Sequence, residues 1–321
     1  MNATVFPPLK DCPQPPLTDT QKRILELKKE RDAVILAHNY VCPEIQDVAD
    51  YVGDSLGLSR QAKKAGAKVI AFAGVDFMAE TAKILNPDKT VVIPDRAAGC
   101  SLEELCEPLE LAAFKKKHPG ALVISYINCG AGVKELSDII CTSGNALDIV
   151  RQIPADREII FCPDQNLGSW IIEQTGRDMI LWNGYCRAHV QYNAEELLEA
   201  KKAFGGAPLV CHPECPKAVR DVSDCVCSTE KMIKFCRGNP SDKFIIATIV
   251  EMIHRLRREI PDKTFISAPV SGKPAQHCRD MLSNTPEKLL KCLETLEPRI
   301  ELSAEVIERA RKPIERMLEM S

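Results

Sequence analysis

Apolar and polar positions follow the same pattern three times along the chain. Each repeat opens with an apolar run that ends in polar side chains: AVILAHNY at 33–40, ALVISYIN at 121–128 and APLVCHPE at 207–214. A helical stretch, a second apolar run, another helical stretch and a last apolar run follow in every repeat. Short β-branched runs that alternate with helical periodicity predict parallel strands joined by helices. The pattern therefore predicts an α/β fold made of three similar units.

The repeats divide the chain into three α/β/α domains of comparable length. We expect the first at 21–107, the second at 108–192 and the third at 193–278. A charged amphipathic segment closes the chain, and we expect C-terminal helices over 279–321 to pack on the first domain. A pseudo-threefold axis that relates the domains would bring one end of each sheet to a common junction, where we expect the active site.

Polar side chains end the first predicted strand of every unit. They are His38 and Tyr40, Tyr126 and Asn128, and His212 and Glu214. Ligands of parallel α/β sheets bind beyond the carboxyl ends of the strands. We therefore expect these six side chains to line one cleft, with three tandem domains that share no site as the alternative.

A hydroxyl follows an aspartate by five residues in every unit. The pairs are Asp50 and Ser55, Asp138 and Ser143, and Asp224 and Thr229. Each hydroxyl precedes a helical pattern, so we expect it to cap a helix N-terminus. Helix N-termini also bind anions, and three of them at one cleft would suit a small polyanionic substrate, although simple capping needs no ligand.

Composition narrows the class of protein further. The 321 residues carry a net charge of −3 and only 5% aromatic residues, which gives no support for binding nucleic acid or an anionic membrane. The N-terminal segment lacks the apolar core of a signal peptide, and no apolar run is long enough to span a bilayer. We therefore expect a cytoplasmic protein.

Fifteen cysteines are unusual for such a chain, and three of them fit the repeat. Cys100, Cys186 and Cys278 close the three units, 62, 60 and 66 residues after His38, Tyr126 and His212. Three thiolates could hold a [4Fe–4S] cluster with one open iron, or a zinc ion with a bound water. The other cysteines fit core positions better than a second metal or redox site, and Cys225 and Cys227 alternate so that both face one side of a strand.

Taken in order, the motifs resemble those of the quinolinate synthase family from about residue 20 to 300. The motifs are AHNY (37–40), GDSLGLS (53–59), FMAETAKILNP (77–87), the AGC of Cys100, SYIN (125–128), TSGNA (142–146), PDQNLG (163–168), WNGYCRAH (182–189), HPEC (212–215), STEKM (228–232) and the HCRDM around Cys278. The resemblance implies three similar domains around a pseudo-threefold axis. It also implies a [4Fe–4S] cluster held by one cysteine from each domain.

The resemblance further implies a reaction and a set of roles. Iminoaspartate would condense with dihydroxyacetone phosphate to give quinolinate, phosphate and water, in the de novo synthesis of NAD. An L-aspartate oxidase or dehydrogenase would supply the iminoaspartate. The cluster ligands would be Cys100, Cys186 and Cys278. The substrate would be bound by His38, Ser55, Tyr126, Asn128, Ser143, His212, Glu214 and Thr229, with Tyr40 as a further active-site residue.

Within that set we expect Glu214 to act as the acid or base on its strand end. His212 and Tyr126 would move or steady protons, while His38 and Tyr40 would orient the substrate and polarise an oxygen. The open iron would act as a Lewis acid. A zinc-dependent lyase or aldolase with the same three thiolates is the alternative.

The chain also departs from the family pattern at several positions. Prolines and a valine often surround the second cysteine, where this chain has Asn183, Arg187 and Ala188. A glutamate often follows the threonine at 248, where this chain has Ile249, with Glu251 nearby. No acidic role is therefore expected at 249.

Overall fold

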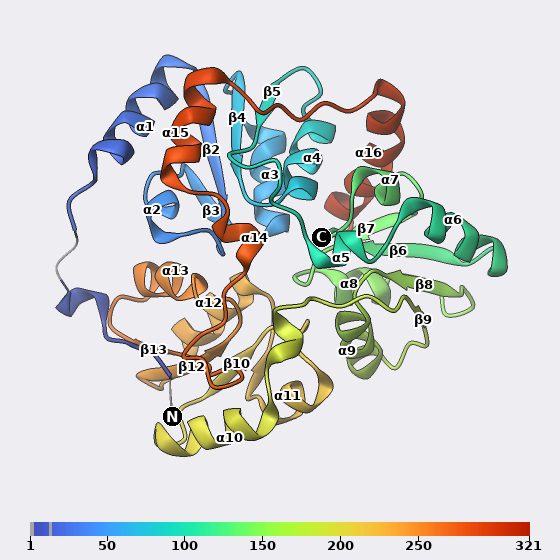
Figure 1. Ribbon diagram of the computed structural model, residues 1–321. Coiled ribbons are helices and arrows are strands. Elements are labelled where there is room, and N and C mark those ends of the chain that lie inside the picture. The colour runs from blue at the N-terminus through green and yellow to red at the C-terminus, as the bar shows by residue number, and fades with distance from the viewer. Residues whose placement is uncertain (1–2, 13–14) are drawn as a thin grey trace.

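The computed structural model describes residues 3–12 and 15–321. Three separate sheets, each flanked by helices, form three lobes in Figure 1: blue to cyan strands above, green strands at the right, and yellow to orange strands below. The α/β class predicted from the repeats is confirmed. None of the helices in the described part of the chain is both long and apolar enough to cross a membrane.

The first sheet has the order β3-β2-β4-β5, and all its pairs are parallel. Its strands are β2 (Ala33–His38), β3 (Tyr51–Gly53), β4 (Val69–Ala73) and β5 (Thr90–Val92). The helices of this lobe are α1 (Asp19–Glu30), α2 (Pro43–Gln46), α3 (Ser55–Lys64), α4 (Asp76–Leu85) and α5 (Ser101–Glu104). The apolar run before His38 is buried in the core, which leaves the polar strand end at the sheet's carboxyl edge.

The second sheet repeats this order as β7-β6-β8-β9 and is also parallel. Its strands are β6 (Leu122–Tyr126), β7 (Ile139–Cys141), β8 (Ile159–Cys162) and β9 (Ile180–Leu181). The helices are α6 (Pro108–Lys117), α7 (Ala131–Lys134), α8 (Ala146–Arg151) and α9 (Gln165–Thr175), followed by the 3-10 turn η2 (His189–Gln191).

The third sheet repeats the order again and gains one antiparallel strand from the N-terminus. Its parallel strands are β10 (Leu209–Cys211), β11 (Cys225–Val226), β12 (Lys243–Ala247) and β13 (Thr264–Ser267), and β1 (Val5–Phe6) pairs with β13. The helices are α10 (Ala194–Ala203), α11 (Lys217–Val222), α12 (Thr229–Gly238), α13 (Met252–Glu259) and α14 (Arg279–Leu282). The 3-10 turn η1 (Leu9–Asp11) follows β1.

The repeated aspartate has the same structural role in every unit. The carboxylates of Asp50, Asp138 and Asp224 accept the backbone N–H of Ile35, Val123 and Leu209 at 2.8, 2.8 and 2.7 Å. In return, the aspartate N–H donates to the carbonyl of that same strand residue. Each aspartate thus ties the amphipathic turn to the strand fifteen residues earlier and fixes where the following hydroxyl lies.

The C-terminal helices meet the prediction only in part. Helix α15 (Pro286–Thr295) packs on α1, α2 and β4 of the first lobe, as expected. Helix α16 (Ala304–Glu319) packs on α4 but also on β7 and α7 of the second sheet, and it lies between these two lobes in Figure 1. Its apolar stripe is wide enough to be buried by two lobes, which the sequence pattern alone could not distinguish from packing on one.

Candidate functional site

One cavity of about 460 Å³ collects side chains from all three lobes. Every site residue predicted from the sequence lines it: His38, Tyr40, Ser55, Cys100, Tyr126, Asn128, Ser143, Cys186, His212, Glu214, Thr229 and Cys278. The alternative of three domains without a shared cavity is therefore wrong. The roles of these residues remain predictions, whereas their placement is a feature of the structure.

The strand ends of the first and third units have the same local geometry. The Nδ1 atom of His38 accepts the backbone N–H of Tyr40 at 3.2 Å, and Nδ1 of His212 accepts that of Glu214 at 3.3 Å. Burial lowers the pKa of His38 to about 3 and that of His212 to about 4. Both rings are therefore neutral at physiological pH, and each carries its hydrogen on Nε2.

The second unit contributes a donor and an unpaired acceptor. The Tyr126 hydroxyl donates to Oε1 of Glu214 at 2.7 Å, and burial raises the pKa of this phenol far above its ordinary value. The Oδ1 atom of Asn128 is buried without a hydrogen-bond partner. A buried polar atom that is left unpaired at a cavity wall is available for a ligand.

Glu214 is the electrostatic centre of this wall. Burial raises its pKa, but His212 and His189, with the hydrogen bonds from His189 and Tyr126, outweigh burial and hold the pKa below its usual range. The carboxylate is therefore ionised and accepts two short hydrogen bonds, from Tyr126 and from Nδ1 of His189 at 2.8 Å. A carboxylate that stays ionised at a cavity wall can accept hydrogen bonds from a bound ligand.

His189 of this wall and Thr248 behind it were missed by sequence reasoning. His189 is 1% exposed and lines the cavity, and its Nδ1 atom also lies 3.2 Å from Sγ of Cys186. Its Nε2 atom contacts the hydroxyl of Thr248, which also contacts Tyr40. The one sequence signal for His189 was its position three residues after a predicted ligand; Thr248 gave none beyond its place after a strand.

The three hydroxyls lie at the cavity but do not cap their helices. The N-caps are Asp54 for α3, Asn145 for α8 and Ser228 for α12, so that part of the prediction is wrong. The Asp54 carboxylate accepts the N–H of Gly57, which leaves the adjacent Ser55 hydroxyl free of the capping role. Ser143 bonds Nε2 of His212 at 3.1 Å, and Thr229 accepts Nδ2–H of Asn39 at 2.9 Å.

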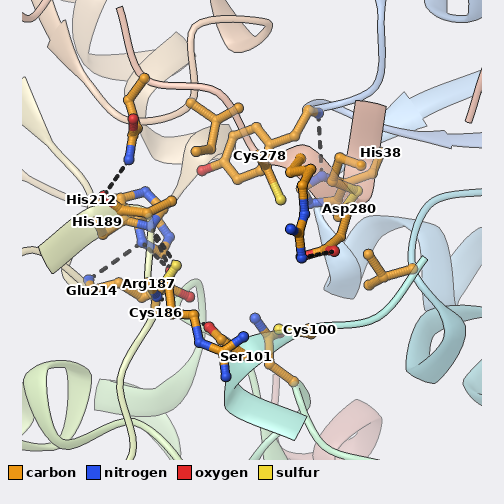
Figure 2. Close-up of a pocket in the computed structure, with 18 of the residues that line it drawn as sticks. His38, Cys100, Ser101, Cys186, Arg187, His189, His212, Glu214, Cys278 and Asp280 are labelled. Carbon is orange, nitrogen blue, oxygen red and sulfur yellow. Dashed lines mark hydrogen bonds and ion pairs between the residues drawn. The ribbon is translucent and has the colours of Figure 1, made fainter. Parts of the chain in front are cut away.

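Cys100, Cys186 and Cys278 come from three equivalent places in the fold. Each follows the fourth strand of its sheet, and the first and third are N-caps of the short helices α5 and α14. Figure 2 shows Cys100 and Cys278 across a common space from the wall of His189, His212 and Glu214, whereas Cys186 lies beside His189 at that wall. Gly184 shapes the second loop, because a Cβ there would lie 2.3 Å from the carbonyl oxygen of Pro163.

The environment of these thiols fits a cation that prefers sulfur. Burial raises the pKa of Cys100 and Cys186 well above the ordinary value and that of Cys278 to about 11. The charge of Glu214 adds to the rise in all three, and Cys278 adds to it for both Cys100 and Cys186. Backbone N–H groups of the following turn oppose this shift in each case. Three mutually repelling thiolates would need a positive group between them, and soft thiolate donors with N–H···S contacts are the usual ligands of iron–sulfur clusters.

A second grouping of metal-ligating atoms shares one of these cysteines. Donor atoms of Cys186, His189 and Glu214 lie within 4.8 Å of one another. The hydrogen bonds that His189 makes with both partners already account for this closeness. This set of a sulfur, a nitrogen and an oxygen ligand would suit zinc better than an iron–sulfur cluster. A zinc site would therefore use His189 and Glu214 with Cys186, whereas a cluster would use Cys186 with the other two cysteines.

Most of the remaining cysteines are core thiols, as the sequence favoured. Cys106, Cys129, Cys141, Cys162, Cys211, Cys215, Cys227, Cys236 and Cys292 are buried. The Sγ atoms of Cys225, in β11, and of Cys227, directly after it, lie 3.5 Å apart, which confirms that both face one side of this segment. None of these ten side chains, nor those of Cys12 and Cys42, lines the cavity.

The departures from the family pattern lie at the cavity and its rim. Arg187 forms an ion pair with Glu104 at 2.7 Å, which joins the second lobe to the first beside Cys186. Ile249 lines the cavity as an apolar side chain, and Glu251 instead accepts a 2.6 Å hydrogen bond from Nδ1 of His277. No acid is therefore present where the family often has one.

Comparison with known proteins agrees with this geometry. A family described as quinolinate synthetase A protein matches residues 22–319. A quinolinate synthase of Thermosynechococcus vestitus is 51% identical over 313 residues, which cover 97% of this chain and 98% of the relative. A quinolinate synthase of a Synechococcus strain is 50% identical over 316 residues, which cover 98% of this chain and 98% of the relative. A quinolinate synthase of Cyanophora paradoxa is 48% identical over 299 residues, which cover 93% of this chain and 91% of the relative.

Proposed function

Because this chain belongs to the quinolinate synthetase A protein family, we propose that it is a quinolinate synthase of NAD biosynthesis. It would condense iminoaspartate with dihydroxyacetone phosphate and release quinolinate, phosphate and water. The observation that carries the proposal is the convergence of all twelve predicted site residues on one cavity, from three lobes. The match to relatives along nearly the whole chain supports the same activity.

The cavity suits two small anionic substrates. Its volume of about 460 Å³ is in the range of small-molecule sites. Three basic residues, Arg187, Lys273 and Arg279, line it and would favour carboxylate and phosphate groups. Ser55, Ser143 and Thr229 supply hydroxyls, and Asn128 supplies an unpaired amide oxygen, so several polar groups can be bound at once.

Cys100, Cys186 and Cys278 would hold a [4Fe–4S] cluster. When bound, such a cluster with three protein ligands supplies an open iron that acts as a Lewis acid toward a substrate oxygen. The three thiols fit this group in donor type and in their shared cavity. The mixed grouping of Cys186, His189 and Glu214 favours the competing function, a zinc-dependent lyase or aldolase.

The chain's own residues divide the proton chemistry between them. The ionised Glu214 would take a proton from substrate carbon or nitrogen and return it to a leaving oxygen. Tyr126 and His189 hold the carboxylate in place by donating to it. Nδ1 of both His38 and His212 is occupied by a backbone N–H, which leaves the hydrogen of each ring on Nε2. The Nε2–H of His38 would donate to a substrate oxygen atom, while that of His212 contacts the Ser143 hydroxyl and would orient it toward the substrate.

Protein purified without oxygen tests this proposal directly. We expect about four iron and four sulfide per chain, an absorbance shoulder of an iron–sulfur cluster, and quinolinate formed from the two substrates. Cys186→Ser should lose both iron and activity. Cys225→Ser is the matched control, because that half-buried thiol lies outside the cavity, and it should keep both.

Two outcomes would overturn the proposal. A colourless protein that contains zinc but neither iron nor sulfide would favour the zinc-dependent lyase. A Cys186→Ser variant with full iron and full activity would show that this thiol is not a ligand.

A further inference from the structure

Ser101 joins the segments that carry two of the predicted cluster ligands. It directly follows Cys100 in the first lobe, and its hydroxyl donates to the Tyr185 carbonyl at 3.3 Å and accepts the N–H of Arg187 at 3.1 Å. Tyr185 and Arg187 are the two neighbours of Cys186 in the second lobe, and Figure 2 shows Ser101 beside Arg187. One hydroxyl therefore holds the backbone on both sides of Cys186 against the segment of Cys100.

Gln276 makes a corresponding link from the third lobe. It lies two residues before Cys278, and its Nε2–H donates to the carbonyl of Ala188 at 2.7 Å. Its backbone carbonyl accepts the N–H of Val250, in the loop after β12, at 2.8 Å. The side chain of Gln276 thus reaches the loop of Cys186, while its backbone is held by the third lobe.

These links matter because the three cysteines belong to three separate sheets. The core of each lobe fixes its own cysteine relative to its own sheet, whereas a cluster needs three sulfur atoms at fixed distances from one another. Residues that hold the ligands in place from behind determine how firmly a protein retains a metal group. Hydrogen bonds between the ligand-bearing segments supply this support across the lobe boundaries.

The two links are better shielded from water than the ion pair that spans the same boundary. The Arg187 and Glu104 side chains of that pair are 56% and 51% exposed, so solvent screens their attraction. Ser101 and Gln276 are 8% and 5% exposed. Their hydrogen bonds therefore depend little on salt and contribute more to the position of the Cys186 loop.

We propose that Ser101 and Gln276 are positioning residues that hold the Cys186 loop between the segments of the other two cysteines. They preserve the arrangement of thiols that retains a [4Fe–4S] cluster. This inference rests on the proposed function, since it presupposes the cluster, and it adds two supporting side chains to the three predicted ligands.

Release of iron to a chelator measures how firmly the cluster is held and needs no turnover. Holoprotein purified without oxygen is mixed with excess EDTA, and the loss of the cluster absorbance is followed well below the unfolding temperature. We expect Ser101→Ala and Gln276→Leu each to release iron about tenfold faster than the wild type, which is the lower end of the effect of removing such supporting groups. Wild-type release rates in both variants would overturn the proposal.

Two conservative variants separate the hydrogen bonds from packing. Ser101→Thr keeps the hydroxyl, so its release rate should stay within about threefold of the wild-type rate. Gln276→Glu keeps the shape of the side chain but places an acceptor oxygen against the Ala188 carbonyl, so it should release iron at least as fast as Gln276→Leu. If Ser101→Thr released iron as fast as Ser101→Ala, the hydroxyl would not be the group that holds the loop.

The cluster-free protein distinguishes positioning from general stability. The thermal midpoint of the cluster-free variants should stay close to that of the cluster-free wild type, because the links hold a loop rather than a core. Midpoints that fall in step with faster iron release would indicate a merely structural role and would contradict the proposal.

Ser223→Ala provides the matched control. The half-buried Ser223 hydroxyl donates to the carbonyl of Val219 in the preceding helix, and the residue does not line the cavity. This variant should release iron at the wild-type rate. A wild type that binds no iron–sulfur cluster would end the proposed function and this inference together, whereas a wild type that binds the cluster and forms quinolinate, with unchanged release in the variants, would end this inference alone.

Discussion

The strand ends of the first and third lobes share one backbone geometry but present side chains of different chemical function. In both, a histidine accepts the N–H of the residue two positions later through Nδ1, so each ring is held in the same tautomer. The later residue is Tyr40 in the first lobe and Glu214 in the third. The repeat thus fixes where a side chain meets the ligand, whereas its identity decides whether it can take a proton.

His189 of the second lobe connects these two ends. Its Nδ1 atom contacts Glu214 directly, and its Nε2 atom reaches Tyr40 through Thr248. The ionised carboxylate of Glu214 therefore influences Tyr40 on the other side of the cavity. If Glu214 transfers protons and Tyr40 only orients the substrate, substitutions at the third-lobe strand end should lower turnover most. Substitutions at the first-lobe strand end should act mainly through the orientation of the substrate.

The largest effect is expected at the third-lobe strand end. Glu214→Gln keeps the shape of the side chain but removes the base, so kcat should fall by about 10²–10⁴. Iron content and the absorbance of the cluster should be unchanged, since Glu214 is not among the proposed ligands. Steady-state kinetics together with metal analysis checks this, and a variant with near wild-type turnover would end the assignment of Glu214 as the base.

A smaller effect is expected at the equivalent position of the first lobe. Tyr40→Phe removes one hydrogen-bonding oxygen without removing a base, so kcat/KM should fall about tenfold. A loss as large as that of Glu214→Gln would mean that Tyr40 itself transfers a proton. The contrast between the two variants, measured under the same anaerobic conditions, separates orientation from proton transfer.

The sequence predicted the positions of the residues at these two strand ends better than the hydrogen bonds that connect them. The threefold pattern placed His38, His212 and the three cysteines, because equivalent positions of repeated sheets converge at one edge. It could not predict that Asp54 and Ser228, rather than Ser55 and Thr229, occupy the N-cap positions of the helices, since a shift of one residue does not change the periodicity. Thr248 and His189 were missed because their roles arise from contacts between lobes, which no local pattern records.

Stability should depend on pH through the two matched histidines. Their folded-state pKa values of about 3 and about 4 lie below the unfolded value near 6.5. Below pH 6.5 the unfolded chain binds protons that the folded protein does not, so stability falls with decreasing pH and levels off above that pH. Each histidine contributes a slope of up to about 1.4 kcal/mol per pH unit.

Replacing His38 and His212 one at a time compares the electrostatics of the two strand ends. His38→Gln and His212→Gln should each flatten the decline of the thermal midpoint between pH 6.5 and 5, and by similar amounts. That window lies above the ordinary pKa of glutamate, so Glu214 contributes little to it. A flattening in only one variant would show that the two strand ends differ in electrostatics as well as in chemistry.

The smallest effects concern the aspartates that anchor the repeated turns. Asp224 accepts a backbone N–H of its strand and also pairs with Lys201 at 2.7 Å, whereas no ion pair of Asp138 is found among the described residues. Asparagine keeps an acceptor oxygen, so Asp138→Asn should cost about 1 kcal/mol of unfolding free energy, and Asp224→Asn up to about 1 kcal/mol more.

The origin of that difference can be isolated in the third lobe. In a Lys201→Met background, Asp224→Asn should cost no more than Asp138→Asn does, because only the bond to the strand remains. High salt should likewise remove the difference, since the Lys201 pair is partly exposed and is screened. If Asp224→Asn still lowered the unfolding free energy more than Asp138→Asn under both conditions, the hydrogen bonds from aspartate to strand would differ in strength between the two lobes. The lobes would then share a topology, but equivalent contacts would contribute differently to stability.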